Sequence, residues 1–161
     1  MPLIYFTPFR LILVDILAWL VIHLGISYLL RQVDDGFFER NKRWFRPFSF
    51  EKSGDFWQKK FRIKAWKDRL PDGTVIAKNG FDKSKLANNN IEYLKQFVIE
   101  TQRAELTHWF LIPPAFLFFL WNPTWAGGVM VIYALVVNLP FIMIQRYNRP
   151  RLERVLNKIK N

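Results

Sequence analysis

The stretch LILVDILAWLVIHLGISYLL, residues 11–30, decides the fold class. It contains one acid, Asp15, and one histidine, His23, and is otherwise almost wholly apolar. A helix needs about 20 such residues to cross the hydrocarbon core of a bilayer, so we expect a transmembrane helix over 11–30. A cleaved signal peptide is the alternative. We favour a retained anchor, because Arg10 is the single basic residue before the run and no small-x-small cleavage site stands out after Gly25.

Two further apolar runs lie in the C-terminal third. The run WFLIPPAFLFFLW (109–121) is short and contains Pro113-Pro114, whereas WAGGVMVIYALVVNLPFIMI (125–144) has spanning length. Tandem prolines remove backbone donors and kink a helix. Between the runs, WNPTW combines an Asn-Pro turn signal with tryptophans typical of membrane interfaces. We therefore expect a membrane helical hairpin over 108–144, in which the first arm either extends upstream through His108 or is partly re-entrant.

The distribution of basic residues predicts the orientation. Of the 24 Lys and Arg residues, one precedes the first span, seventeen lie within 31–103 and six follow residue 144. The positive-inside rule places such segments in the cytoplasm. We expect a multi-pass protein of the cell membrane, with 31–107 cytoplasmic or interfacial and 145–161 a basic cytoplasmic tail. All of 1–161 would form a single membrane domain.

The region 31–107 interleaves aromatic and basic residues, as in FFERNKRWFRPFSF (37–50). Such stretches lie in the headgroup layer of membranes, and the same residue types bind nucleic acid. Because the chain also contains three apolar runs, we favour lipid over nucleic acid as the partner of this region. FRIKAW (61–66) and TVIAKNG (74–80) predict a small β-hairpin as an option, and Asn90 is an expected N-cap for a helix from Ile91. The fold class is thus a mainly α membrane protein with about three transmembrane or re-entrant helices.

The densest polar cluster is IETQRAELTHW, residues 99–109. On a helix, its polar side chains share one broad face. Glu105 and His108 are spaced i, i+3 and can meet. A histidine oriented by Glu105, or by Glu100, is a workable general base, and Arg103 suits an anion or a developing oxyanion. The structural alternative is a plain Glu100–Arg103 ion pair and an interfacial His108.

Other polar residues are weaker candidates. Asp15 is expected to pair with a residue of the last span such as Asn138, and His23 to pack between helices. QRYNR (145–149) offers Arg146, Asn148 and Arg149 for a headgroup or a donor phosphate, or acts only as a positive-inside stop. Asp68, shortly before the LPDG turn, and Asp72, within it, could touch sugar hydroxyls, although a turn favours Asp and Gly anyway.

Three blocks together resemble a known family: FSFEKSGDFWQKKFRIKAWKDRLPDG (48–73), IETQRAELTHW (99–109) and QRYNRPRL (145–152). They look like the glycosyl-4,4'-diaponeurosporenoate acyltransferases, small membrane proteins of carotenoid pathways. The resemblance implies esterification of a sugar hydroxyl of a glycosylated C30 carotenoid acid with a fatty acyl chain, the last step towards staphyloxanthin-like pigments. It brings no catalytic residues with it.

The expected chemistry needs no cofactor beyond an acyl thioester of coenzyme A or a carrier protein as co-substrate. With no cysteine and two histidines, the chain does not favour a metal site. It lacks the HxxxxD arrangement of glycerolipid acyltransferases, since Tyr28 and Pro113 stand five residues after the histidines, and it lacks a GxSxG elbow. We therefore expect direct attack on the donor. Expected partners are the carotenoid, the acyl donor, membrane lipid and a second copy or other pathway enzymes.

Two other function classes stay open. A non-catalytic protein that binds carotenoid or lipid, or that scaffolds a pathway, would use the same polar helix face for assembly. A small membrane methyltransferase or reductase would need a nucleotide pocket, and the sequence has no glycine-rich phosphate loop.

Overall fold

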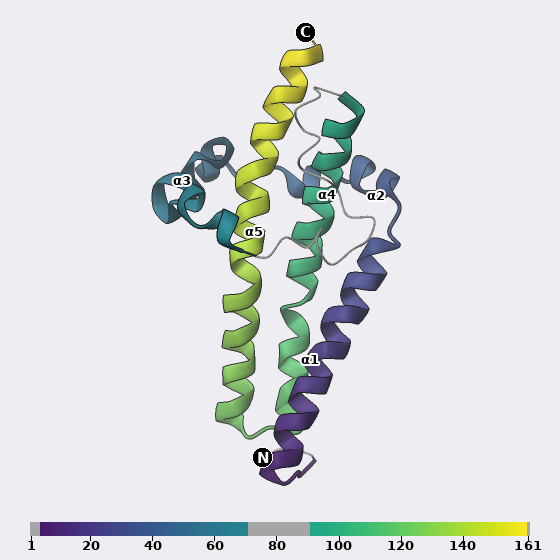
Figure 1. Cartoon of the computed structure of the whole chain (residues 1–161), viewed down its shortest axis with the longest axis vertical. Coiled ribbons are helices and arrows are strands. Elements are labelled where there is room, and N and C mark those ends of the chain that lie inside the picture. The colour runs from purple at the N-terminus through teal and green to yellow at the C-terminus, as the bar shows by residue number, and fades with distance from the viewer. Residues whose placement is uncertain (1–3, 71–90, 161) are drawn as a thin grey trace. The chain divides into compact units, whose positions relative to one another are not determined.

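The computed structural model describes residues 4–70 and 91–160, and these residues form helices and no strand (Figure 1). Packing divides the chain into two units. The first consists of Met1–Val33 and Leu106–Ile142, and the second of Asp34–Glu105 and Met143–Asn161. Each unit is described below by itself.

Helix α1, Pro8–Arg31, contains the whole of the first apolar run, so the predicted helix is confirmed. Proline at its start fits the first helical turn, where an N–H would have no intrahelical partner. Within α1, only Asp15 and Trp19 are buried. The rest of the helix exposes large apolar side chains, including Ile12, Leu20 and Val21.

Two helices among the described residues are long and apolar enough to cross a membrane: Pro8–Arg31 and Thr124–Ile159, with mean hydropathies of 2.1 and 2.2 over their most apolar windows. The predicted third crossing is not confirmed. Its apolar run begins at the end of α4, Ile91–Phe110, and continues as a 3₁₀ helix, η7, Pro113–Leu120. The proline pair explains the break, because neither residue can donate to the α-helical ladder.

Helix α5, Thr124–Lys160, is longer than predicted. It runs through Pro140 and Pro150 without ending, so the segment from residue 145 continues the same helix. The predicted turn at WNPTW is present: Trp121, Asn122 and Pro123 connect η7 to α5, which begins at Thr124.

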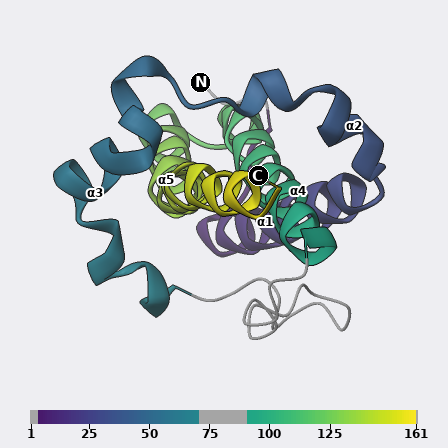
Figure 2. The same ribbon diagram turned by 90° about the horizontal axis from the view of Figure 1, so that it is seen from above.

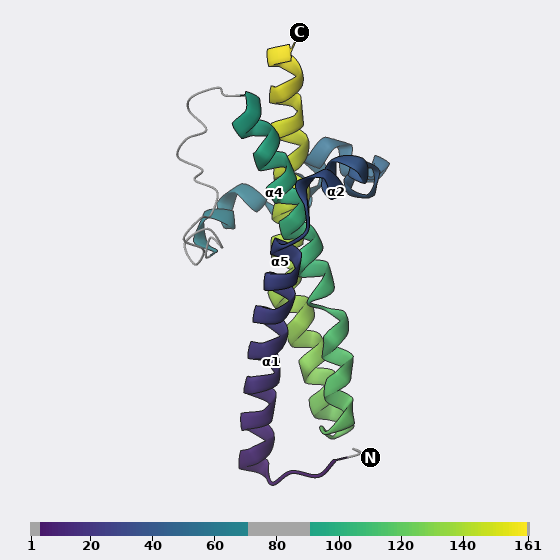
Figure 3. The same cartoon turned by 90° about the vertical axis from the view of Figure 1, so that its right-hand side faces the viewer.

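The first unit packs around Trp19. Its indole stacks on Phe118 of η7, with ring centroids 4.7 Å apart, and its Nε1 donates to Sδ of Met130 on α5 at 3.3 Å. Ala115 and Ala134 complete this core. These small residues let α1, η7 and the first part of α5 lie side by side, as Figures 1 and 3 show.

Beside parts of α4 and α5, the second unit contains short helices: α2 (Asp35–Arg40), η1 (Lys42–Phe45), η2 (Ser49–Gly54), α3 (Asp55–Phe61), η3 (Ile63–Ala65) and η4 (Lys67–Arg69). In Figure 2, α2 lies beside α4 and α3 lies beside α5. The predicted strand FRIKAW is wrong, because these residues end α3 and form η3. Its expected partner TVIAKNG and the expected cap Asn90 lie outside the described residues.

Gly54 brings η2 close to α5 in the second unit. It has φ +91°, and a Cβ there would lie 3.0 Å from the carbonyl oxygen of Tyr147. Only glycine adopts this conformation freely and permits such an approach. Next to it, Ile63 packs with Ile144 and Tyr147 in a small apolar core.

Candidate functional site

His108, near the end of α4, bonds to an amide on α5 within the first unit. Its Nδ1 lies 2.9 Å from Oδ1 of Asn138, and its ring stacks on Phe141 with centroids 4.6 Å apart. Asn138 is fully buried. The expected orienting carboxylate is thus replaced at Nδ1 by an amide from a residue 30 positions further along the chain.

The amide fixes the tautomer of His108. Nδ2 of Asn138 donates to the carbonyl oxygen of Ala134 at 2.8 Å, so Oδ1 is the atom that faces the imidazole. An amide oxygen only accepts, so Nδ1 of His108 carries the hydrogen. In the neutral ring, Nε2 then holds the lone pair and is the atom that can take a proton.

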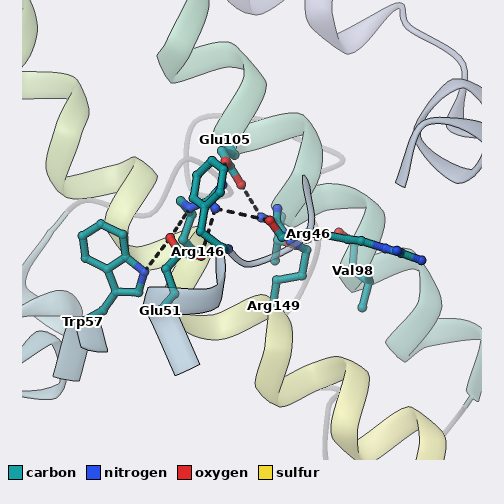
Figure 4. Close-up of polar contacts among 9 residues, drawn as sticks. Arg46, Glu51, Trp57, Val98, Glu105, Arg146 and Arg149 are labelled. Carbon is teal, nitrogen blue, oxygen red and sulfur yellow. Dashed lines mark hydrogen bonds and ion pairs between the residues drawn. The ribbon is translucent and has the colours of Figure 1, made fainter. Parts of the chain in front are cut away.

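Glu105 of α4 lies in an ion-pair network of the second unit (Figure 4). Its Oε1 accepts from Nη1 of Arg146 at 2.7 Å, and its Oε2 accepts from Nη2 of Arg149. Arg146 also donates to Glu51 through Nε at 2.6 Å and Nη2 at 2.9 Å. Both oxygens of Glu105 are therefore occupied by arginines, and its predicted role beside His108 is not supported.

Glu51, in η2, is the second buried carboxylate of this network. It also accepts from the indole Nε1 of Trp57 at 3.1 Å and from the backbone N–H of Phe48 at 2.9 Å. Glu51 is fully buried, and Glu105 is 2% exposed. A buried carboxylate is stable only when its oxygens are paired and hydrogen-bonded. The bond from Trp57 therefore ties η2 to α3 and the bonds from Arg146 tie it to α5, whereas the bond from Phe48 caps η2 itself.

Glu100 and Arg103 face a different partner, Asp35 of α2. Arg103 donates to Asp35 through Nη2, and its Nε lies 3.4 Å from Glu100. Gln96 donates to both carboxylates at 3.1 Å. Residues two apart on a helix point to opposite sides, which explains why Arg103 and Glu105 do not share the single polar face predicted. This arrangement matches the plain ion-pair alternative.

The remaining predicted binding residues are scattered. Arg146 and Arg149 are brought together by Glu105, whereas Asn148, between them on α5, is half-buried and has no hydrogen bond to another described residue. Asp68 is 80% exposed and pairs with its neighbour Lys67 at 3.0 Å. Asp72 lies outside the described residues.

The partner predicted for Asp15 is wrong. Its Oδ1 accepts from Nε1 of Trp121 and from Nδ2 of Asn122, both at 2.8 Å. Asp15 therefore ties α1 to the turn before α5, and Asn138 serves His108 instead. His23 packs against Trp19, four residues earlier on the same helix, with centroids 5.5 Å apart, so this contact does not test the expected packing between helices.

Reasoning from the sequence did not identify Glu51, and it assigned Asn138 as a partner of Asp15 although Asn138 bonds to His108. Glu51 lies 95 residues from Arg146, so no local spacing connects them. The sequence does contain a local indication of the role of Glu51. An acid three residues after Phe48 takes the N3 position of a helical turn, and from there its side chain caps that turn. An asparagine within an apolar span likewise indicates a buried polar partner.

Comparisons with known proteins show which family this chain is similar to. The family model for glycosyl-4,4'-diaponeurosporenoate acyltransferase matches residues 41–158. A protein of that name from Staphylococcus aureus strain MRSA252 is 38% identical over 142 residues, which cover 88% of this chain and 86% of the relative. Those from strains bovine RF122 / ET3-1 and USA300 are 37% identical with the same coverage. No solved structure matches. The chain belongs to the glycosyl-4,4'-diaponeurosporenoate acyltransferase family.

Proposed function

We propose that this chain transfers a fatty acyl group from an acyl thioester to a sugar hydroxyl of a glycosylated C30 carotenoid acid. Membership of the family makes it an acyltransferase of carotenoid biosynthesis. The sugar ester and the thioester donor are the finer parts of the proposal. The observation that carries the proposed base catalysis is the bond between His108 and Asn138, which leaves Nε2 of the ring as a proton acceptor.

The proposed step is direct acyl transfer. Nε2 of His108 takes the hydroxyl proton while the sugar oxygen attacks the thioester carbonyl carbon. The tetrahedral intermediate then breaks its C–S bond, and the leaving thiolate takes the proton back from Nε2. A positioned general base contributes about 10²–10⁴-fold to such a reaction. Asn138 acts as a positioning residue that holds the ring and its tautomer.

The test is product formation by the full chain in nanodiscs, with a glycosylated carotenoid acid and a long-chain acyl thioester, read by mass. We expect His108→Ala to lower kcat about 10²–10⁴-fold while helix content and insertion stay unchanged. His108→Gln is the matched control, because it keeps a polar side chain but has no basic nitrogen, and it should lose as much. Ester formation that survives both changes would overturn the role of His108. Carotenoid binding without any ester would favour the scaffold alternative.

We also propose that the chain is a multi-pass protein of the cell membrane, with the basic segments cytoplasmic. In support, α1 and the first part of α5 expose contiguous large apolar side chains, among them Leu13, Ile16, Ile132 and Val136. Soluble monomers rarely expose apolar patches of more than a few hundred Å². Lipid contact accounts for this surface, and the positive-inside rule gives the orientation.

The absence of cysteine makes the orientation easy to test. Thr124, at the turn, and Asn157, near the C-terminus, are both exposed. Single variants Thr124→Cys and Asn157→Cys, treated with a membrane-impermeant maleimide in intact cells, should react only at Thr124→Cys. After cell lysis both should react. The reverse pattern would contradict the orientation. A homodimer or a complex with pathway enzymes stays a prediction, to be checked by the mass of the solubilised particle.

A further inference from the structure

The two buried arginines of α5 differ in how many of their guanidinium nitrogens donate hydrogen bonds. Arg146 donates from all three guanidinium nitrogens: Nε and Nη2 to Glu51, Nη1 to Glu105, and Nη2 also to the carbonyl oxygen of Arg46 at 3.3 Å. Arg149 donates only from Nη2, to Glu105. Its Nε and Nη1 have no hydrogen-bond partner in the part of the chain that the structure describes. Arg149 is 2% exposed, so solvent does not replace the missing partners.

Unpaired donors on a buried charged group are costly. Leaving one buried polar group without a partner costs about 1–3 kcal/mol, and more for a charged group. Proteins rarely keep such groups without a ligand or bound water. A guanidinium with free N–H groups matches the oxygens of a phosphate or a carboxylate better than any other side chain. The unused donors of Arg149 therefore indicate a site for an anion.

The surrounding charges favour an anion as well. Glu105 is shared between Arg146 and Arg149, while Glu51 serves Arg146. Glu153, the third carboxylate, interacts electrostatically with Arg149, Arg46 and Lys42. Four cationic side chains thus stand against three carboxylates. The buried arginines and carboxylates balance, so the surplus comes from the exposed Lys42 and Arg46 and favours an anion near Arg149.

A second unpaired polar atom lies on the same helix face as Glu105. Gln102, three residues earlier on α4, is 3% exposed, and its Oε1 has no hydrogen-bond partner among the described residues. Residues three apart on a helix are neighbours. Gln102 therefore stands beside the carboxylate that Arg149 contacts.

We propose that Arg149, and not Arg146, binds the phosphate of the acyl donor, whereas Arg146 holds the protein together. The proposal rests on the proposed function, because it takes the donor to be a phosphate-bearing thioester. The ring of Phe45 covers the guanidinium of Arg149, 5.5 Å from Cζ to the ring centroid. The phosphate belongs either to the donor or to a lipid headgroup, and the experiment separates these sources.

The experiment compares two acyl donors with the same chain. Acyl-coenzyme A carries phosphate, and S-acyl-N-acetylcysteamine is a thioester without it. With the full chain in nanodiscs, Arg149→Lys should raise the ratio of the KM for acyl-coenzyme A to the KM for the phosphate-free donor at least tenfold. The reason is that an ammonium cannot reproduce the guanidinium fork. Arg151→Lys, on the same helix and paired with exposed Asp55 at 3.1 Å, is the matched control and should leave the ratio unchanged.

Arg146→Lys distinguishes binding from stability. It should lower the midpoint of unfolding and leave the KM ratio unchanged. An unchanged ratio in Arg149→Lys, or equal changes for both donors, would overturn the proposal. If Arg149→Lys instead changes activity only in nanodiscs that contain phosphatidylglycerol, the phosphate comes from lipid and the donor assignment is overturned.

A calorimetric measurement separates this proposal from the proposed function. If the wild type makes no ester from either thioester, the proposed function fails while coenzyme A binding can still be measured. Binding of coenzyme A by the wild type that weakens at least tenfold in Arg149→Lys supports the phosphate site. No binding of coenzyme A by the wild type would overturn it.

Discussion

The two units bury polar side chains in opposite ways. In the first unit, each buried polar group has few partners and most partners are neutral: Asp15 accepts from an indole and an amide, and His108 bonds to an amide. In the second unit, buried polar groups form a charged network around Glu51, Glu105 and two arginines. The difference follows from the surroundings we propose. A charge is far more costly within the hydrocarbon core than in a basic, water-facing bundle.

The largest expected effect comes from removing one charge of the network. Glu105→Gln leaves Arg146 with one fewer counter-ion and Arg149 with none in direct contact. Breaking a buried ion pair by removing one partner costs about 3–5 kcal/mol. We expect this loss in the free energy of unfolding, measured by denaturation with SDS in mixed micelles. Glu100→Gln, in a more exposed ion pair of the same helix, is the control. An equal loss of stability in both variants would contradict the greater weight given to the buried network.

The corresponding change in the first unit should cost less. Asp15→Leu leaves Trp121 and Asn122 without their acceptor, but no charge is left unpaired by it. Buried donors without partners cost about 1–3 kcal/mol. We expect that loss in the same denaturation experiment. Trp121→Phe should reduce the penalty of Asp15→Leu in a double-mutant cycle, because it removes one of the orphaned donors. Simple additivity of the two changes would contradict the assigned contact.

A smaller effect is expected at Asn138, and it concerns activity. Asn138→Ala removes the acceptor for Nδ1 of His108, so the ring no longer has a fixed tautomer. One hydrogen bond of about 1.4 kcal/mol corresponds to about a tenfold fall in kcat. We expect KM to stay within twofold of the wild-type value. A fall in stability with kcat unchanged would show that the bond serves only packing.

The smallest effect on stability should come from an exposed ion pair of the second unit. Asp35→Asn removes the carboxylate that pairs with Arg103, but the side chain of Asp35 is 45% exposed. Exposed ion pairs contribute about 0–1 kcal/mol. We expect a loss below about 1 kcal/mol that shrinks further in 0.5 M salt by screening, a dependence that Glu105→Gln should lack.

The sequence predicted what depends on local pattern. The helix from Ile91 and the helix over 11–30 follow from periodicity and length, and both are present. Periodicity failed at FRIKAW, where alternating basic and apolar residues suggested a strand and packing of Ile63 on Ile144 and Tyr147 selected helical turns.

Long-range partners could not be read from spacing. The single-face interpretation of 99–109 failed because α4 has neighbours on several sides, so Arg103 meets α2 while Glu105 meets α5. His108 bonds to a residue 30 positions away and Glu51 to one 95 positions away. Such pairs depend on tertiary packing, which no local period encodes.

The 3₁₀ helix after Pro113-Pro114 changes how far a short apolar run reaches. A 3₁₀ helix rises about 2.0 Å per residue and an α-helix about 1.5 Å. The eight residues of η7 therefore extend over about 16 Å, where an α-helix would extend over about 12 Å. Residue counts based on α-helical rise thus underestimate the length of this segment, and a short run that contains a proline pair reaches further than its number of residues suggests.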